Sequence, residues 1–148
     1  MKTFSARQRG FTLIEILIVI GIIAILAAAV IVAINPGRLF DQANDTTRRT
    51  DLTELLSAIS RNRVDNRGVI NSAITTSRTE ICKTGGTCTG LADLSYLTTN
   101  ANYIDEMPID PECTSTNGTC YFVKKNTNNT ITVDAFLYNA LASISFTQ

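Results

Sequence analysis

A few residues near the start of the chain have the types and spacing for proteolytic processing followed by charge pairing in an apolar environment. Gly10 directly precedes Phe11, and Glu15 is the single charged residue between Phe11 and Ile34. A carboxylate in a bilayer costs about 2.5–3.5 kcal/mol even on a lenient insertion scale, so its presence indicates a function and a partner. Cleavage after Gly10 would create that partner, because the new amine of Phe11 is a cation about one helical turn from Glu15.

The four cysteines form a second group of reactive side chains. An even number of cysteines suits disulfides in an oxidising compartment. Their spacings are C-x5-C and C-x6-C rather than the C-x2-C of a structural zinc site, and the chain has no His to complete one. Each neighbouring pair flanks a turn signal, so we expect Cys82–Cys88 and Cys113–Cys120, while sequence alone leaves the other two connectivities open.

Two clusters of charged side chains are further candidates for sites. The first cluster consists of four acids in a turn-rich stretch: Asp105, Glu106, Asp110 and Glu112. We expect them to lie in a solvated loop rather than to catalyse a reaction or bind calcium. The second cluster consists of five arginines: Arg48, Arg49, Arg61, Arg63 and Arg67. Most of them lie among acidic residues of the chain, so we expect them to form ion pairs within the protein rather than to bind DNA. The chain lacks the commonest general base and metal ligand, His, so we expect no enzyme activity, no metal and no cofactor.

The overall charge balance hides an asymmetry. The 148 residues contain 13 basic and 13 acidic side chains. All the charges before Phe11 are basic, namely Lys2, Arg7 and Arg9, so the rest of the chain is mildly acidic. That composition disfavours a general nucleic-acid binder.

The elements that must position the first group are a basic leader, residues 1–10, and an apolar helix, residues 11–35. The apolar run is long enough to span a bilayer, and the basic residues before it predict a cytoplasmic N-terminus. An ordinary secretory signal or signal anchor is the alternative, since the alanines at 27–29 offer a conventional cleavage site. Glu15 argues against it, because an anchor has no need of a charge inside its apolar run.

Residues 36–67 are predicted to form an amphipathic helix after a break at 35–37. Pro36 suits the first helical position, and Gly68 suits a left-handed stop. Asp45 can pair with Arg48 and Arg49, which lie three and four residues further on. The apolar stripe has helical spacing and consists of Leu52, Leu55, Leu56 and Ile59.

Residues 68–148 are predicted to form a globular region that contains the disulfides. Residues 69–118 read as mostly irregular, with a short helix around Leu91, Leu94 and Leu97. The end of the chain alternates like strands, and the third strand follows a turn near Asn139; the expected strands cover 120–125, 130–137 and 142–147. The predicted fold class is therefore α+β, a long N-terminal helix packed on a small antiparallel sheet of about three strands.

The stretch RGFTLIE, followed by an apolar helix, resembles the N-terminus of type IV prepilins and type II secretion pseudopilins. The resemblance implies that prepilin peptidase cuts after Gly10 and methylates the amine of Phe11, and that Glu15 aligns each new subunit during assembly. The close likeness covers about residues 7–35. The D-x-x-RR-x-D-L pattern, MPIDP and the C-terminal strands resemble bacterial type IV pilins more loosely.

Two details refine this resemblance. Major pseudopilins carry an acidic calcium loop near the C-terminus, whereas Asp134 is the only acid here beyond Glu112, which favours a pilin. Many pilins carry a proline deep in the apolar helix, whereas this chain has Val32 there and its proline at Pro36. The weak points that this helix offers are therefore Gly21 and the break at 35–37.

The resemblance implies a structural subunit of a type IV pilus, polymerised through its apolar helices into a surface filament for adhesion, motility or DNA uptake. The alternatives are a pseudopilin of a type II secretion system and a membrane-anchored extracytoplasmic protein. The implied partners are prepilin peptidase, other pilin subunits, the inner-membrane assembly machinery and, before assembly, membrane lipid. The implied location is the bacterial cytoplasmic membrane, in a single pass, and then the extracellular filament.

Overall fold

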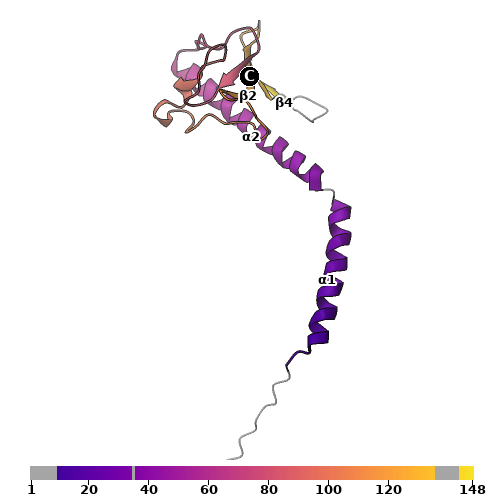
Figure 1. Ribbon diagram of the computed structural model, residues 1–148. Helices are drawn as coiled ribbons and strands as arrows, with labels where there is room; N and C mark the ends of the chain where they lie inside the picture. The colour runs from indigo at the N-terminus through magenta and orange to yellow at the C-terminus, as the bar shows by residue number, and fades with distance from the viewer. Residues whose placement is uncertain (1–9, 35, 136–143) are drawn as a thin grey trace, which may run out of the picture. The chain divides into compact units, whose positions relative to one another are not determined.

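The structure, a computed structural model, describes residues 10–34, 36–135 and 144–148 and has an α+β architecture (Figure 1). The chain forms two compact units, Met1–Leu39 and Phe40–Gln148. Its elements are α1 (Leu13–Ile34), α2 (Pro36–Asp65), β1 (Thr79–Cys82), the 3-10 turns η1 (Ser95–Leu97) and η2 (Thr99–Ala101), β2 (Gly118–Lys125), β3 (Ile131–Ala135) and β4 (Ile144–Thr147).

Helix α1 is apolar on every side. Its sequence consists almost entirely of Ile, Leu, Val and Ala, which are tolerated or favoured in a membrane helix. The segment Leu13–Ile31 has a mean hydropathy of 3.1, and none of it is buried within the protein. Among the described residues, α1 is the one helix long and apolar enough to cross a membrane. An apolar surface of this size needs lipid or other protein to cover it.

Helix α2 begins at Pro36 and ends at Asp65, and the residues that follow, up to Gly68, form the predicted stop. The last turn closes when the N–H of Gly68 donates to the carbonyl of Arg63 at 2.7 Å, with Gly68 at φ +87°. Arg67 is itself left-handed, at φ +57°, so the helical path is already broken before Gly68. The expected break includes Asn35, which lies outside the described residues.

The sheet has four antiparallel strands in the order β1-β2-β3-β4, one more than the sequence predicted. Strands β2, β3 and β4 occupy the three segments expected to be strands. The ends of two expected strands, including Leu137, and the turn at Asn139 lie outside the described residues. The strands follow one another in chain order as a meander.

The strand missed by sequence analysis, β1, is only four residues long. It pairs with β2 through Thr79–Val123 and Glu80–Phe122, and its register shifts between Glu80 and Cys82. A four-residue strand with a bulge shows too little alternation to be recognised from its own residues. Pairing with β2 stabilises β1, so the residues that determine this strand lie about 40 positions further along the chain.

The segment around Leu91–Leu97 contains one short 3-10 turn, η1, rather than a regular helix, and η2 follows it. Leu94 and Leu97 are nevertheless fully buried, so the apolar residues that suggested a helix do serve the core. The Asp93 carboxylate accepts a hydrogen bond from the N–H of Ser95 at 3.0 Å and starts the first turn. This hydrogen bond lowers the pKa of Asp93 below its ordinary value.

One apolar core holds the second unit together. It joins the stripe of α2 to the inner face of the sheet, and the predicted stripe residues are all buried, together with Ala58. The largest buried side chain is Tyr121, whose hydroxyl donates to the Asp51 carboxylate of α2 at 2.6 Å. Other core residues are Leu52, Leu55, Ile59, Ile81, Leu94, Leu97, Ile104, Met107, Val123, Ile131, Val133 and Ala135.

Candidate functional site

The N-terminal segment places Gly10 and Phe11 immediately outside a helix. Residues 10–12 are irregular and exposed, and α1 begins at Leu13. Phe11 is 80% exposed, and nothing lies within 4 Å of the position that a Cβ on Gly10 would occupy. The peptide bond between Gly10 and Phe11 therefore lies outside the helix and is uncovered, so a peptidase can reach it.

Thr12 caps α1 and separates this extended segment from the helix. Its hydroxyl accepts a hydrogen bond from the N–H of Glu15 at 3.3 Å, and its carbonyl accepts from Ile16 at 3.3 Å. A side-chain oxygen at this position satisfies one of the donors that a helix leaves unpaired at its N-terminus. Sequence analysis missed Thr12, although Thr12-x-x-Glu15 is the local signature of such a cap.

Glu15 lies in the first turn of α1 and is exposed. A negative charge in this position is favoured by the partial positive charge at the helix N-terminus. This effect reduces the cost of a carboxylate at the start of an apolar helix without removing it. An amine on Phe11 would lie one turn before this carboxylate in the same chain, so both charges would border one end of α1.

A second cluster of charge lies inside the globular unit, around Arg48 of α2. Its guanidinium binds both carboxylate oxygens of Asp110, at 2.6 Å from Nε and 3.0 Å from Nη2. It also contacts Asp45 at 2.9 Å and Glu112 at 2.6 Å. These hydrogen bonds, led by that to Asp110, raise the pKa of Arg48 above its ordinary value. We name these four residues the Arg48 clamp.

The Arg48 clamp corrects one sequence prediction. The four acids were expected to form a solvated loop, and Asp105 and Glu106 are indeed exposed. Asp110 is only 4% exposed and Glu112 is half-buried, because both carboxylates form ion pairs with Arg48. The pairing of Asp45 with Arg48 along the helix is present as predicted, but the contacts to Asp110 and Glu112 join α2 to the stretch before β2.

Other arginines also have protein partners. Arg61 donates to the carbonyl of Tyr103 at 2.5 Å, and Arg63 donates to the carbonyl of Gly68 at 3.2 Å. Arg78 pairs with Asp134 and lies over the ring of Phe122 at 3.5 Å from its centre. These contacts favour pairing within the protein, as the sequence suggested for the arginines of the helix.

The two disulfides are Cys82–Cys88 and Cys113–Cys120, the pairs expected from the turn signals. Among the described residues, one group of side chains has a spacing that could suit a metal ion: Glu80, Cys113 and Cys120. The second disulfide argues against a metal there. Both thiols are used in the disulfide, and the Glu80 carboxylate accepts from the N–H of Cys120 at 2.9 Å. The group therefore joins β1 to β2 and offers no set of ligands for a metal.

Removing the Cys113–Cys120 disulfide by a double Cys→Ser substitution is expected to destabilise the globular unit by about 2–3 kcal/mol. The same change at Cys82 and Cys88 is the matched comparison, since the two loops are of nearly equal length. The Cys113–Cys120 loop directly follows Glu112, so its release also loosens the Arg48 clamp and should cost more. Urea unfolding of the full chain measures both, and equal midpoints for the two variants would contradict the link to the clamp.

Taken together, the described residues combine one helix apolar enough to cross a membrane, an uncovered Gly10–Phe11 bond in front of it and an α+β globular unit, which suggests a membrane-anchored protein. Comparison with known proteins agrees with this class: residues 5–31 match the family model of the prokaryotic N-terminal methylation motif. This motif is typical of type IV pilins and pseudopilins, so the match over residues 5–31 supports a precursor of that type without extending to the rest of the chain. No curated protein and no solved structure matches the chain.

Proposed function

We propose that the chain is a structural subunit of a type IV pilus. The observation that supports this most strongly is α1 itself, an apolar helix that buries none of its segment Leu13–Ile31 in its own protein and carries one carboxylate in its first turn. Lipid covers such a helix before assembly, and the apolar helices of other subunits cover it afterwards. The globular unit supplies the surface of the filament and has its own core.

In this proposal prepilin peptidase cuts after Gly10 and methylates the amine of Phe11. The basic leader stays in the cytoplasm, and the globular unit lies on the other side of the cytoplasmic membrane. The inner-membrane assembly machinery then moves the subunit from lipid into the filament. During this transfer Glu15 pairs with the Phe11 amine of a neighbouring subunit, because an unpaired charge is costly in an apolar bundle.

We propose a structural rather than an enzymatic role. The chain has no His, and the buried carboxylate of Asp110 is bound to Arg48. Asp51 accepts from Tyr121, and Asp134 is bound by Arg78. Among the described residues these charged groups therefore have partners within the fold, which supports a structural role for them.

The methylation motif fits a pseudopilin of a type II secretion system equally well. A pilus is favoured because the last described acid, Asp134, forms an ion pair with Arg78 rather than belonging to an acidic calcium loop. Shearing cells, collecting the filaments and sequencing the N-terminus of their subunit tests the proposal directly. Loss of protein export on deletion of the gene, without loss of filaments, would favour the pseudopilin.

The mature protein is expected to begin at Phe11 with a methylated amine, and Gly10→Val is expected to leave the uncut precursor in the membrane. The reason is that Val would place a β-branched side chain directly beside the bond that is proposed to be cut, where the native residue has no side chain. Gly21→Val is the matched control, because neither glycine has a neighbour within 4 Å of its Cβ position. Mass spectrometry of the mature N-terminus provides the test, and a start at Met1 or beyond Ala29 would contradict it.

A further inference from the structure

The dipeptide Asn117–Gly118 lies where two disulfide loops meet. We call Cys82–Cys88 the first disulfide loop and Cys113–Cys120 the second. The dipeptide is the one place in the chain where Gly follows Asn. An asparagine before glycine loses ammonia spontaneously with particular ease, because glycine has no side chain to hinder ring closure. The dipeptide is therefore a candidate for a covalent modification that needs no enzyme.

Packing explains why residue 118 is a glycine. The carboxylate of Glu80, on β1, occupies the space that a Cβ on Gly118 would need, and it accepts a hydrogen bond from the N–H of Cys120 at 2.9 Å. Gly118 is buried and pairs with Cys82 across the two strands. A larger residue would displace Glu80, so the fold requires a glycine after Asn117 and with it a chemically labile amide.

Three hydrogen bonds hold this dipeptide in place. The carbonyl of Asn117 accepts from the N–H of Lys83 at 2.9 Å, and its Oδ1 accepts from the N–H of Thr87 at 3.1 Å. The N–H of Gly118 donates to Oγ of Ser115 at 2.9 Å. Lys83 and Thr87 belong to the first disulfide loop and Ser115 to the second. Each loop therefore supplies part of the hold on Asn117.

The direction of the Gly118 N–H opposes the reaction in the folded protein. Deamidation begins when the nitrogen of Gly118 forms a bond to Cγ of Asn117, and in the resulting ring Cγ takes the place of the amide hydrogen. In the structure that hydrogen points to Oγ of Ser115 instead. The peptide plane must therefore rotate before the new bond can form, which breaks its hydrogen bonds to Lys83 and Ser115. Such a rotation requires local opening of both loops.

We propose that Asn117 modifies itself in chains whose first disulfide loop is open and is protected in chains whose loop is closed. The nitrogen of Gly118 attacks Cγ, the C–N bond of the side-chain amide breaks, and ammonia leaves with the proton of the attacking N–H. Water then opens the succinimide ring at either carbonyl carbon, which gives aspartate or isoaspartate. No oxidant or reductant takes part. This inference does not depend on whether the chain polymerises.

Isoaspartate at residue 117 marks a subunit that failed to close its loop. When water opens the ring at the main-chain carbonyl, the backbone runs through the former side chain and gains a carbon atom directly before β2. The pairing of Gly118 with Cys82 and the hydrogen bond from Cys120 to Glu80 then no longer fit their register. The modified chain therefore cannot return to the native arrangement of β1 and β2.

The test follows residue 117 in the full chain in detergent micelles. The chain with both disulfides and the double variant Cys82→Ser with Cys88→Ser are incubated in the same mildly alkaline buffer. Peptide mapping by mass spectrometry measures the conversion of amide to acid, and labelling by a protein isoaspartyl methyltransferase identifies isoaspartate. We expect the variant to convert Asn117 about tenfold faster or more, because the freed amide does not wait for its hydrogen bonds to open.

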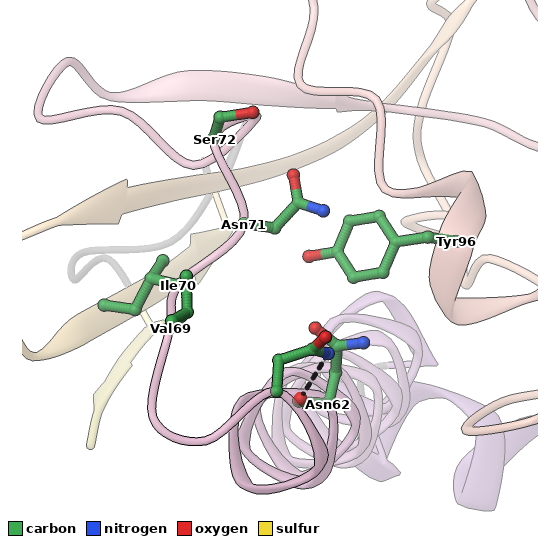
Figure 2. Close-up of a pocket in the computed structure, with 7 residues that line it drawn as sticks. Asn62, Val69, Ile70, Asn71, Ser72 and Tyr96 are labelled. Carbon is green, nitrogen blue, oxygen red and sulfur yellow. Dashed lines mark hydrogen bonds between the residues drawn. The ribbon is translucent and has the colours of Figure 1, made fainter.

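Asn71 is the reference within the same chain. Figure 2 shows it in a hollow of about 560 Å³ that lies beside Tyr96 at the C-terminal end of α2. The small residue Ser72 follows it, and its Oδ1 accepts from the N–H of Ala73 at 2.9 Å, a hydrogen bond within its own segment. Opening the first disulfide loop should leave the conversion of Asn71 unchanged, whereas unfolding of the whole globular unit would accelerate both asparagines.

A second pair of variants tests the hold without removing a disulfide. Ser115→Ala removes the acceptor of the Gly118 N–H and should accelerate the conversion of Asn117 severalfold. Thr114→Ala removes an exposed hydroxyl from the neighbouring position and should leave the rate unchanged. The mark itself is tested with reduced wild-type chain that is aged and then reoxidised. Isoaspartate should be depleted from the fraction that regains both native disulfides.

Four results would overturn the inference. The intact chain converts Asn117 as fast as the disulfide variant does, or Asn71 accelerates equally in that variant, so that protection comes from the whole unit rather than from the loop. Ser115→Ala converts no faster than Thr114→Ala. Finally, chains with isoaspartate regain both native disulfides as fully as unmodified chains do, in which case the modification marks nothing.

Discussion

Replacing Glu15 by Leu is expected to lower filament yield about tenfold or more while leaving the cleaved subunit at normal abundance in the membrane. The charge penalty of the lone helix disappears, so the subunit fits lipid better than before. The subunit nevertheless loses the group that, in the proposed filament, pairs with the Phe11 amine of its neighbour. Each 1.4 kcal/mol of lost docking energy is about a tenfold change in the docking equilibrium. The measurement pairs membrane-fraction abundance with the amount of sheared filament.

Two further substitutions separate charge pairing from helix capping. Glu15→Gln keeps the size and polarity of the side chain without its charge, and it should lose filaments nearly as completely as the Leu variant. Thr12→Ala removes the cap bond to the N–H of Glu15 but keeps the carboxylate, so its cleaved form should still assemble. Normal filaments from Glu15→Leu, or an equal loss in cleaved Thr12→Ala, would contradict the pairing role.

Arg48→Ala is expected to destabilise the globular unit by about 3–5 kcal/mol, the cost of leaving a buried charge without its partner. Asp110 would then keep its burial and lose both of its hydrogen bonds to the guanidinium. Arg48→Lys should recover only part of the loss, because an ammonium cannot bind both carboxylate oxygens in the planar geometry of a guanidinium. Urea unfolding of the full chain in micelles gives the free energies of unfolding.

The controls for this prediction come from the same helix and the same pair. Arg49→Ala removes an exposed arginine one position away and should change stability by less than about 0.5 kcal/mol. The double variant Arg48→Met with Asp110→Leu should restore much of the stability, because apolar residues of similar volume can replace a buried ion pair. If Arg48→Ala and Arg49→Ala unfold at the same urea concentration, the Arg48 clamp contributes nothing.

Features encoded by local spacing could be predicted from the sequence. The apolar stripe of α2 repeats every three or four residues, and its members are buried. Pro36 and Gly68 mark the two ends of that helix with backbone properties that no other residues share. The two disulfides close short loops around turn signals, so their pairing also follows from neighbours in the chain.

Features that depend on distant residues could not be predicted in the same way. Arg48 and Asp110 lie 62 residues apart, and Asp51 and Tyr121 lie 70 apart. An acid in a turn-rich stretch has the same local pattern whether water or a buried guanidinium surrounds it. Strand β1 and the hollow beside Tyr96 likewise arise only when separate segments pack together. Thr12 differs, because its capping signature is local and was overlooked.

The separation in sequence between α2 and the strands that pack on it also affects when the globular unit can fold. Asp51 leaves the ribosome 70 residues before Tyr121, the buried tyrosine that it binds. At a synthesis rate of about 5–20 residues per second, the apolar stripe of α2 therefore stays exposed for on the order of 4–14 s before the strand that packs on it is made. During that interval the new chain presents Leu52, Leu55 and Ile59 to its surroundings. A subunit that stops before β2 would never bury them, so degradation can recognise an incomplete subunit by this stripe.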